Sequence, residues 1–137
     1  ATTVTLRSAH DDESGGPVID IIGDDSGLLI GRRGETLRAL QFLVNLMVRP
    51  RIGEESTRVT LDVERYRERR QNSIQALARR VADRVAASGS AIALEPMSPS
   101  ERRIVHMALA NHTRVTTQST GIGESRQISI IPRHLSQ

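Results

Sequence analysis

The sequence predicts an α+β fold in which two small domains are joined by a long helix. Two observations support this prediction. Short β-branched segments alternate with segments of helical periodicity, and one helical segment is much longer than the others. The 137 residues are enough for one domain of ordinary size or for two very small ones. Because Phe42 and Tyr66 are the only aromatic residues, the core must be built from aliphatic side chains.

The chain is expected to begin with a β-hairpin and a short helix. VTLRS (4–8) and VIDII (18–22) are β-branched segments, and the turn residues HDDESGG (10–16) between them predict that the two strands pair as a hairpin. A turn is expected over residues 23–26. GLLIG (27–31) leaves room only for a short helix, whose three aliphatic residues we expect to be buried.

A second helix is expected from Glu35 to Val48, followed by a third strand. The helix prediction rests on apolar residues at helical spacing, namely Leu37, Leu40, Leu43, Val44 and Met47. Pro50 and Gly53 are expected to end this helix. RVTLDV (58–63) alternates and is β-branched, so a strand is expected there.

A long helix is expected over about residues 64–87, because one apolar stripe has helical spacing. The stripe consists of Ile74, Leu77, Ala78, Val81 and Val85. At about 1.5 Å per residue the helix would be roughly 36 Å long. Its other faces are rich in Arg, which favours a solvated connector. Two alternatives stay open: that the Arg face extends a nucleic-acid track, or that YRERR (66–70) docks a partner.

The remaining elements are a short strand at 91–95, a helix at 98–112 and a closing hairpin over 115–131 with its turn at Gly121 and Gly123. The expected order is therefore ββααβ, long helix, βαββ. It predicts a first domain over residues 1–66, a connecting helix over 67–90 and a second domain over 91–137.

The charge distribution favours polyanionic partners. Residues 1–30 hold six acidic residues and one Arg, whereas residues 31–137 hold 18 Arg and ten acidic residues. The same balance also fits a solvated surface in an Arg-rich proteome. The absence of Lys argues against the phosphate loop of nucleotide hydrolases, and the absence of Cys excludes disulfides and thiolate metal sites. No apolar run is long enough for a membrane span.

The segment LLIGRRGETL (28–37) contains a Gly-x-x-Gly turn between two expected helices. Without side chains, Gly31 and Gly34 would allow a sugar-phosphate strand to lie against the backbone, and Arg32 and Arg33 would reach its phosphates. The neighbouring residues Leu29, Ile30 and Leu37 are expected to form a shallow apolar groove for unstacked bases. The alternative is a plain helix–turn–helix corner, with Gly for geometry and Arg for solubility.

A second pattern, SPSERRIVH (98–106), predicts a well-defined helix start and a paired cationic surface. Ser98, Pro99 and Glu101 fit the N-cap, the first helical position and a capping box. Arg102 and His106 are four residues apart, so we expect them to face outward together, with Arg103 nearby. The alternative is that they are unrelated surface residues.

Metal binding and catalysis are not expected. His106 and His112 are six residues apart, off one helical face, and no Cys accompanies them. No Ser, base and acid are spaced as a nucleophilic triad. We therefore expect no cofactor, no metal and no enzymatic activity.

The combination of LIGRRGETLRALQ, LDVERYRERR and PMSPSERRIVH, in this order, resembles the SpoIIIJ-associated (Jag-like) family of bacterial proteins. The resemblance extends from about residue 4 to Pro132. It implies a KH domain of the bacterial type (type II-like) followed by an Arg-x3-His domain. The helix that usually leads such a KH domain is absent here, and the long helix after the third strand is expected to take its packing place.

The resemblance also implies a cytoplasmic RNA-binding protein that is tied to cell elongation and division. A second small protein made of one KH domain is an implied partner. The expected nucleic-acid-binding residues are Ile30, Gly31, Arg32, Arg33, Gly34, Arg102, Arg103, His106, Arg114 and Arg126. Of these, Arg114 and Arg126 are inferred from their charge and their proximity to the closing hairpin. The alternative function is a protein–protein interaction scaffold that forms a homodimer through the KH unit, and the choice between RNA and single-stranded DNA stays open.

Overall fold

The computed structural model describes residues 2–7, 17–23, 26–52 and 58–135. It divides into two compact units, Ala1–Glu68 and Arg69–Gln137. The turn expected at 10–16, residues 24–25 of the turn expected at 23–26 and the helix end expected at Gly53 lie outside the described residues.

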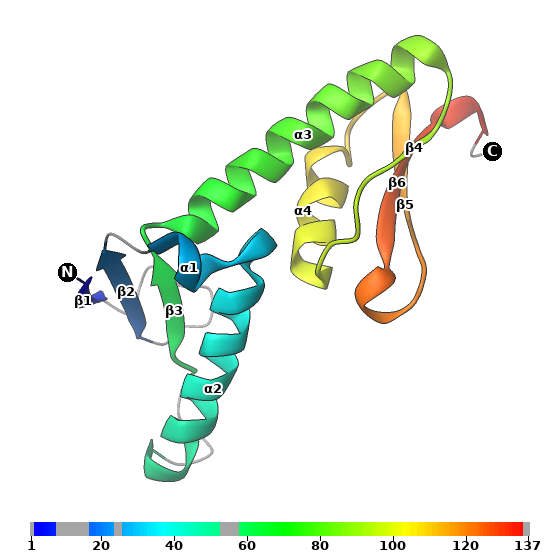
Figure 1. The fold of residues 1–137 in the computed structure, drawn as a ribbon. Helices are drawn as coiled ribbons and strands as arrows, with labels where there is room; N and C mark the ends of the chain where they lie inside the picture. Colours follow the sequence, from blue (N-terminus) through cyan, green and yellow to red (C-terminus); the bar gives the residue numbers. More distant parts are fainter. Residues whose placement is uncertain (1, 8–16, 24–25, 53–57, 136–137) are drawn as a thin grey trace. The chain divides into compact units, whose positions relative to one another are not determined.

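The first unit has the expected order ββααβ (Figure 1). Its elements are β1 (Thr2–Arg7), β2 (Val18–Gly23), α1 (Ser26–Ile30), a 3-10 turn (Arg32–Gly34), α2 (Glu35–Ile52) and β3 (Thr60–Val63). The sheet order is β1-β2-β3, in which β2 runs antiparallel to β1 and parallel to β3. The expected hairpin of β1 and β2 is thereby confirmed, and β3 is shorter than expected.

The core of the first unit lies between one face of this sheet and the two helices. Leu37, Leu61 and Val63 are its buried residues. Partly buried side chains from the elements around them complete this core: Ile19, Ile21, Leu29, Ile30, Leu40, Val44 and Tyr66. The aliphatic core that the composition predicts is confirmed, with the Tyr66 ring as its one aromatic member.

Side chains of α2 close the outer edge of β3. The amide of Asn45 donates to the Val59 carbonyl (2.9 Å) and accepts from the Val59 N–H (2.8 Å). The side-chain oxygen Oε1 of Gln41 accepts from the Leu61 N–H (3.0 Å), and Arg67 Nε donates to the Leu61 carbonyl (3.1 Å). Two amide side chains and one guanidinium therefore take the hydrogen-bonding place of a fourth strand.

The second unit packs two helices on a three-stranded antiparallel sheet. Its elements are most of α3 (Tyr66–Ser88), β4 (Ile92–Ala93), α4 (Pro99–Ala108), β5 (Val115–Thr120), a 3-10 turn (Gly123–Ser125), β6 (Gln127–Pro132) and a last 3-10 turn (Arg133–Leu135). The sheet order is β4-β6-β5, and β6 runs antiparallel to both neighbours. The closing hairpin is confirmed, whereas α4 ends at Ala108 and the β4 strand covers only two residues.

The long helix α3 begins at Tyr66 because Glu64 (φ 49°) and Arg65 (φ 56°) adopt the left-handed conformation, which no α-helix continues. From Ile74 to Val85 its apolar stripe is part of the second unit's core, together with side chains of β4, α4, β5 and β6. The helix is therefore a structural element of that unit rather than a separate connector. The expectation that it takes the packing place of a leading KH helix is wrong for this part of α3.

One prediction of burial is wrong. Leu28 in α1 is 76% exposed, although all three aliphatic residues of this helix were expected to be buried. In α2, Leu43 and Met47 are also exposed, and the helix continues past Pro50 to Ile52. Gln41 and Asn45 occupy the inward face instead, because their amides satisfy the β3 edge. Within the described part of the chain, no helix is both long and apolar enough to span a membrane.

Candidate nucleic-acid interface

The Gly-x-x-Gly turn joins α1 to α2 through backbone conformations that favour glycine. Gly31 and Gly34 have φ angles of 71° and 78°, and Arg33 between them is also left-handed, with φ 54°. The Gly31 N–H donates to the Gly27 carbonyl (3.0 Å) at the end of α1. Three positive φ angles within four residues therefore form the corner.

Neighbouring side chains also require glycine at both positions. A methyl carbon added at Gly31 would lie 2.8 Å from Thr36 Cβ, and one added at Gly34 would lie 2.8 Å from Cε1 of the Tyr66 ring. Each distance is shorter than van der Waals contact, so a side chain at either glycine would force its neighbour to move. Thr36 and Tyr66 therefore occupy the space that side chains would need at these two positions, and Gly34 is buried.

The two arginines of the turn have different environments. Arg32 is exposed, whereas Arg33 is half-buried and its Nε atom is shielded from solvent. Arg32 is therefore more accessible to a phosphate than Arg33, and contact of either side chain with phosphate stays a prediction.

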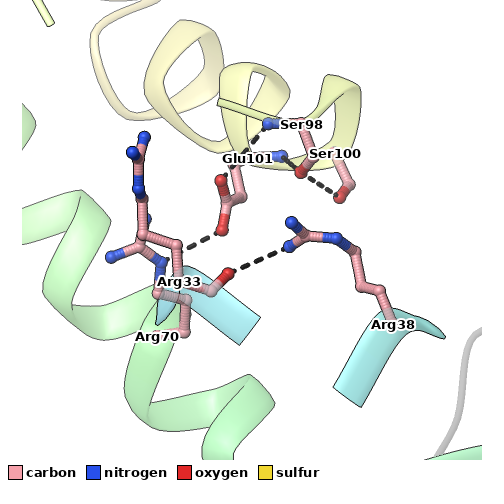
Figure 2. A network of polar contacts seen from close by, with 6 residues as sticks. All are labelled: Arg33, Arg38, Arg70, Ser98, Ser100 and Glu101. Carbon is pink, nitrogen blue, oxygen red and sulfur yellow. Dashed lines mark hydrogen bonds and ion pairs between the residues drawn. The ribbon is translucent and has the colours of Figure 1, made fainter. Parts of the chain in front are cut away.

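A third arginine, Arg38, lies beside the turn. Its Nη1 donates to the Arg33 carbonyl oxygen (3.0 Å), so its guanidinium is directed back across the turn from the first part of α2 (Figure 2). This bond is exposed and uses one of the five N–H donors of the guanidinium. Arg38 is not among the contact residues that the sequence predicts. The sequence feature that could have identified it as a contact residue is its position four residues after Gly34, at the start of the expected helix.

The prediction of an apolar groove beside the turn is wrong in one respect. Leu37 is only 2% exposed and belongs to the core, so its side chain is not available to a base. Leu29 and Ile30 are half-buried and pack against that core. The apolar surface left beside the turn is therefore smaller than expected.

The start of α4 in the second unit matches the predicted capping box. Ser98 Oγ accepts from the Glu101 N–H, and Glu101 Oε2 accepts from the Ser98 N–H, both at 3.3 Å. The other carboxylate oxygen of Glu101 accepts from Arg70 Nε on α3 at 3.0 Å (Figure 2). Because Glu101 is buried, this bridge compensates its desolvated charge and joins α4 to the beginning of α3.

Arg102 and His106 are half-buried and hydrogen-bond within the unit, contrary to the expectation that they point outward together. Arg102 Nη1 donates to the Met97 carbonyl and, at 3.5 Å, to the Arg126 carbonyl. His106 bonds Thr117 Oγ1 through Nδ1 (2.5 Å) and Ser119 Oγ through Nε2 (3.0 Å). The pair therefore ties α4 to β5 and to Arg126, the residue that precedes β6.

The imidazole of His106 is held in its neutral form. Burial, and to a lesser extent the positive charge of Arg102, lower the pKa of His106 below its usual value. A neutral imidazole donates from one nitrogen and accepts at the other, and hydroxyl groups can meet either role. At neutral pH the ring consequently adds no positive charge to this surface.

The other expected contact residues of the second unit are spread over it. Arg103 is exposed on α4. Arg126 Nη1 donates to the Gly121 carbonyl (2.7 Å) at the hairpin turn, close to Arg102. Arg114 Nη2 donates to the Ala86 carbonyl (2.9 Å) near the end of α3. The structure thus brings Arg102, His106 and Arg126 together, while Arg103 and Arg114 bond elsewhere or face solvent.

His112 has a structural role of its own. Its Nδ1 accepts from the N–H groups of Arg114 (3.1 Å) and Val115 (3.2 Å), which fixes the turn that leads into β5. Among the residues that the structure describes, no group of three or more His, Cys, Asp or Glu side chains is placed to hold a metal ion.

Comparison with known proteins assigns both units. The family profile for the KhpA/KhpB KH domain matches residues 2–64, and the profile for the Arg-x3-His domain matches residues 72–132. The chain belongs to the Jag-like family of proteins that combine these two domains. The resemblance seen in the three sequence motifs is thereby confirmed, and so is the α+β fold class.

Two curated relatives illustrate this relationship. The RNA-binding protein KhpB of Clostridium symbiosum is 45% identical over 112 residues, which cover 82% of this chain and 50% of the relative. The protein of the same name from Bacillus subtilis is 42% identical over 113 residues, covering 80% of this chain and 53% of the relative. The chain therefore spans about half the length of these relatives.

Proposed function

We propose that this chain binds single-stranded RNA and that the Gly-x-x-Gly turn is its main phosphate contact. One observation carries the proposal: the partly exposed backbone of Gly31, in the turn that buried Gly34 completes, lies next to the exposed side chains of Arg32 and Arg38. A sugar-phosphate strand can approach such a corner closely and receive charge-assisted hydrogen bonds there. The name that both relatives carry, RNA-binding protein, supports this choice.

The biological setting of this binding rests on the family resemblance alone. We place the chain in the cytoplasm, as a post-transcriptional regulator that is linked to cell elongation and division. A small single-KH-domain protein is the proposed partner. Neither unit is proposed to catalyse a reaction.

The test is a titration of a fluorescent single-stranded RNA with the wild type and with the double variant Arg32→Gln, Arg38→Gln. Each lost charge-assisted contact is worth on the order of 1.5 kcal/mol, so the double variant is expected to bind at least tenfold more weakly. The slope of log Kd against log salt should also become shallower, because fewer counterions are released.

The matched control is Arg79→Gln with Arg80→Gln, which removes two exposed arginines from α3 and leaves the net charge equal to that of the test variant. Its affinity is expected to fall much less. Equal losses in the two double variants would show that only net charge matters and would contradict the assignment of the site.

The second candidate function is a scaffold that dimerises through the KH unit. Four exposed apolar side chains on α2 favour it: Phe42, Leu43, Leu46 and Met47. The closed edge of β3 opposes a dimer that forms by pairing of β3 strands. Sedimentation with and without RNA distinguishes the two functions, since a scaffold dimer would persist without RNA and would be lost in Phe42→Ser with Met47→Ser.

A further inference from the structure

The tip of the β5–β6 hairpin presents one isolated apolar side chain to solvent. Ile122 is 90% exposed, more than any other large hydrophobic residue that the structure describes. It lies between Gly121 (φ 99°) and Gly123 (φ 62°), at a turn where polar residues are usual.

Hydrogen bonds hold this tip in one conformation. Ser125 Oγ donates to the Ile122 carbonyl (2.8 Å), Arg126 Nη1 donates to the Gly121 carbonyl (2.7 Å), and the Arg126 N–H donates to the Gly123 carbonyl (3.2 Å). A carbon added at Gly121 would lie 3.1 Å from Arg126 Cα, so the two sides of the turn are closely packed. Ile122 is therefore presented by an ordered turn.

The Arg-x3-His signature supports the base of the same hairpin. His106 bonds two hydroxyl groups of β5, and Arg102 and the Met97 N–H both donate to the Arg126 carbonyl where β6 begins. Through these bonds α4 fixes the direction in which the hairpin projects. The signature residues can thus act in binding without contacting the ligand themselves.

We propose that the hairpin tip is a base-binding element, in which Ile122 packs on the face of an unstacked base while Arg126 contacts the adjoining phosphate. This inference rests on the proposed RNA function. The second unit contains no Trp, Tyr or Phe, so an exposed aliphatic side chain is a candidate for covering a base. Arg126 keeps further N–H donors for a phosphate, although Glu124 contributes one opposing charge to the tip.

The sharpest test uses Ile122→Trp in the intact chain. Because the wild type has no Trp, the variant carries a single fluorescent reporter at the tip. Stacking of a base on the indole should quench its emission and strengthen binding of single-stranded RNA by about threefold or more. Unquenched emission at saturating RNA would overturn the proposal.

A second variant, Ile122→Ser, tests the native side chain. Its affinity for single-stranded RNA should fall about threefold to tenfold, while an RNA backbone of equal length without bases should bind the variant and the wild type equally. The control Met107→Ser removes another exposed apolar residue of the same unit and should leave binding unchanged. Equal losses in both Ser variants, or an equal loss on the baseless strand, would overturn the base contact.

The outcomes also separate this proposal from the one on which it rests. If the wild type fails to bind RNA, the proposed function is wrong. If the wild type binds and the Arg32, Arg38 variant is weakened, but both Ile122 variants behave like the wild type, only the role of the hairpin tip is wrong.

Discussion

At the residue scale, Gly34 shows how one position serves both folding and the candidate site. Its φ of 78° is strained for any other residue, and the Tyr66 ring occupies the space that a side chain would need. Gly34 is itself buried, so it serves the candidate site by shaping the turn that carries Gly31 and Arg32. Replacing this glycine by a charged residue would therefore disturb the fold as well as any RNA contact.

We expect Gly34→Ala to lower the free energy of unfolding by about 2 kcal/mol or more, because backbone strain and a steric clash add together. The measurement is urea denaturation of the intact chain. Gly27→Ala is the matched control, since nothing lies within 4 Å of a carbon added at Gly27, which sits in α1. The control should be neutral or slightly stabilising, and a similar loss in both variants would refute the clash.

Arg102 and His106 mark the limit of prediction at this scale. Their four-residue spacing correctly placed them on one side of α4, but spacing does not indicate which partners surround a side chain. The hydroxyl groups of Thr117 and Ser119 and the carbonyl of Arg126 come from the closing hairpin, more than ten residues further along the chain. The inward orientation of the pair therefore depends on tertiary packing that a helical wheel does not contain.

At the scale of the elements, sequence patterns predicted the structure best where neighbouring residues or the helical period determine it. The capping box at Ser98 and Glu101 is confirmed because both partners lie within one turn. The stripe from Ile74 to Val85 is confirmed because burial of a helix face imposes its period. The sequence did not predict that Gln41 and Asn45 face the sheet, because both look like surface residues, whereas their amides pair with the β3 edge.

This edge closure leads to a prediction for Asn45→Ala. The substitution would leave the N–H and carbonyl of Val59 without their side-chain partners, and Val59 is 7% exposed. We expect the free energy of unfolding to fall by about 1–3 kcal/mol. The re-opened edge should also promote self-association, which light scattering would detect.

Asn72→Ala is the control for this experiment, because it removes an exposed amide from α3. It should change neither stability nor association. Suppose that Asn45→Ala had the same free energy of unfolding as the control and showed no more self-association. The side-chain bonds to Val59 would then add nothing to stability, and the account of the closed edge would be wrong.

At the scale of the whole molecule, each compact unit has its own core and its own candidate RNA contact. In sequence, the buried residues of the first core run from Leu37 to Val63, and those of the second core run from Ile74 to Ile130. The first unit ends at Glu68, within the first turn of α3, and the second begins at the next residue. The two units are therefore linked directly, through one helix. A single RNA strand that occupies one unit therefore raises the effective concentration of RNA at the other.

This linkage predicts that affinity depends on RNA length. A strand of about four nucleotides can fill the Gly-x-x-Gly site alone, whereas a strand of about 20 or more can engage both units of the intact chain. We expect the longer strand to bind more than tenfold more tightly, after correction for the number of registers in which it can bind. The measurement is a titration series over RNA length at constant salt.

The double variant Arg32→Gln, Arg38→Gln supplies the control, because it weakens one of the two sites and leaves the other intact. In that variant the long strand should bind more tightly than the short strand only by the factor that its larger number of binding registers predicts. If wild type and variant instead gained equally with length, extra length would be adding non-specific phosphate contacts rather than a second site. Tight binding would then come from the Arg-rich surface as a whole, and the two-site account would have to be given up.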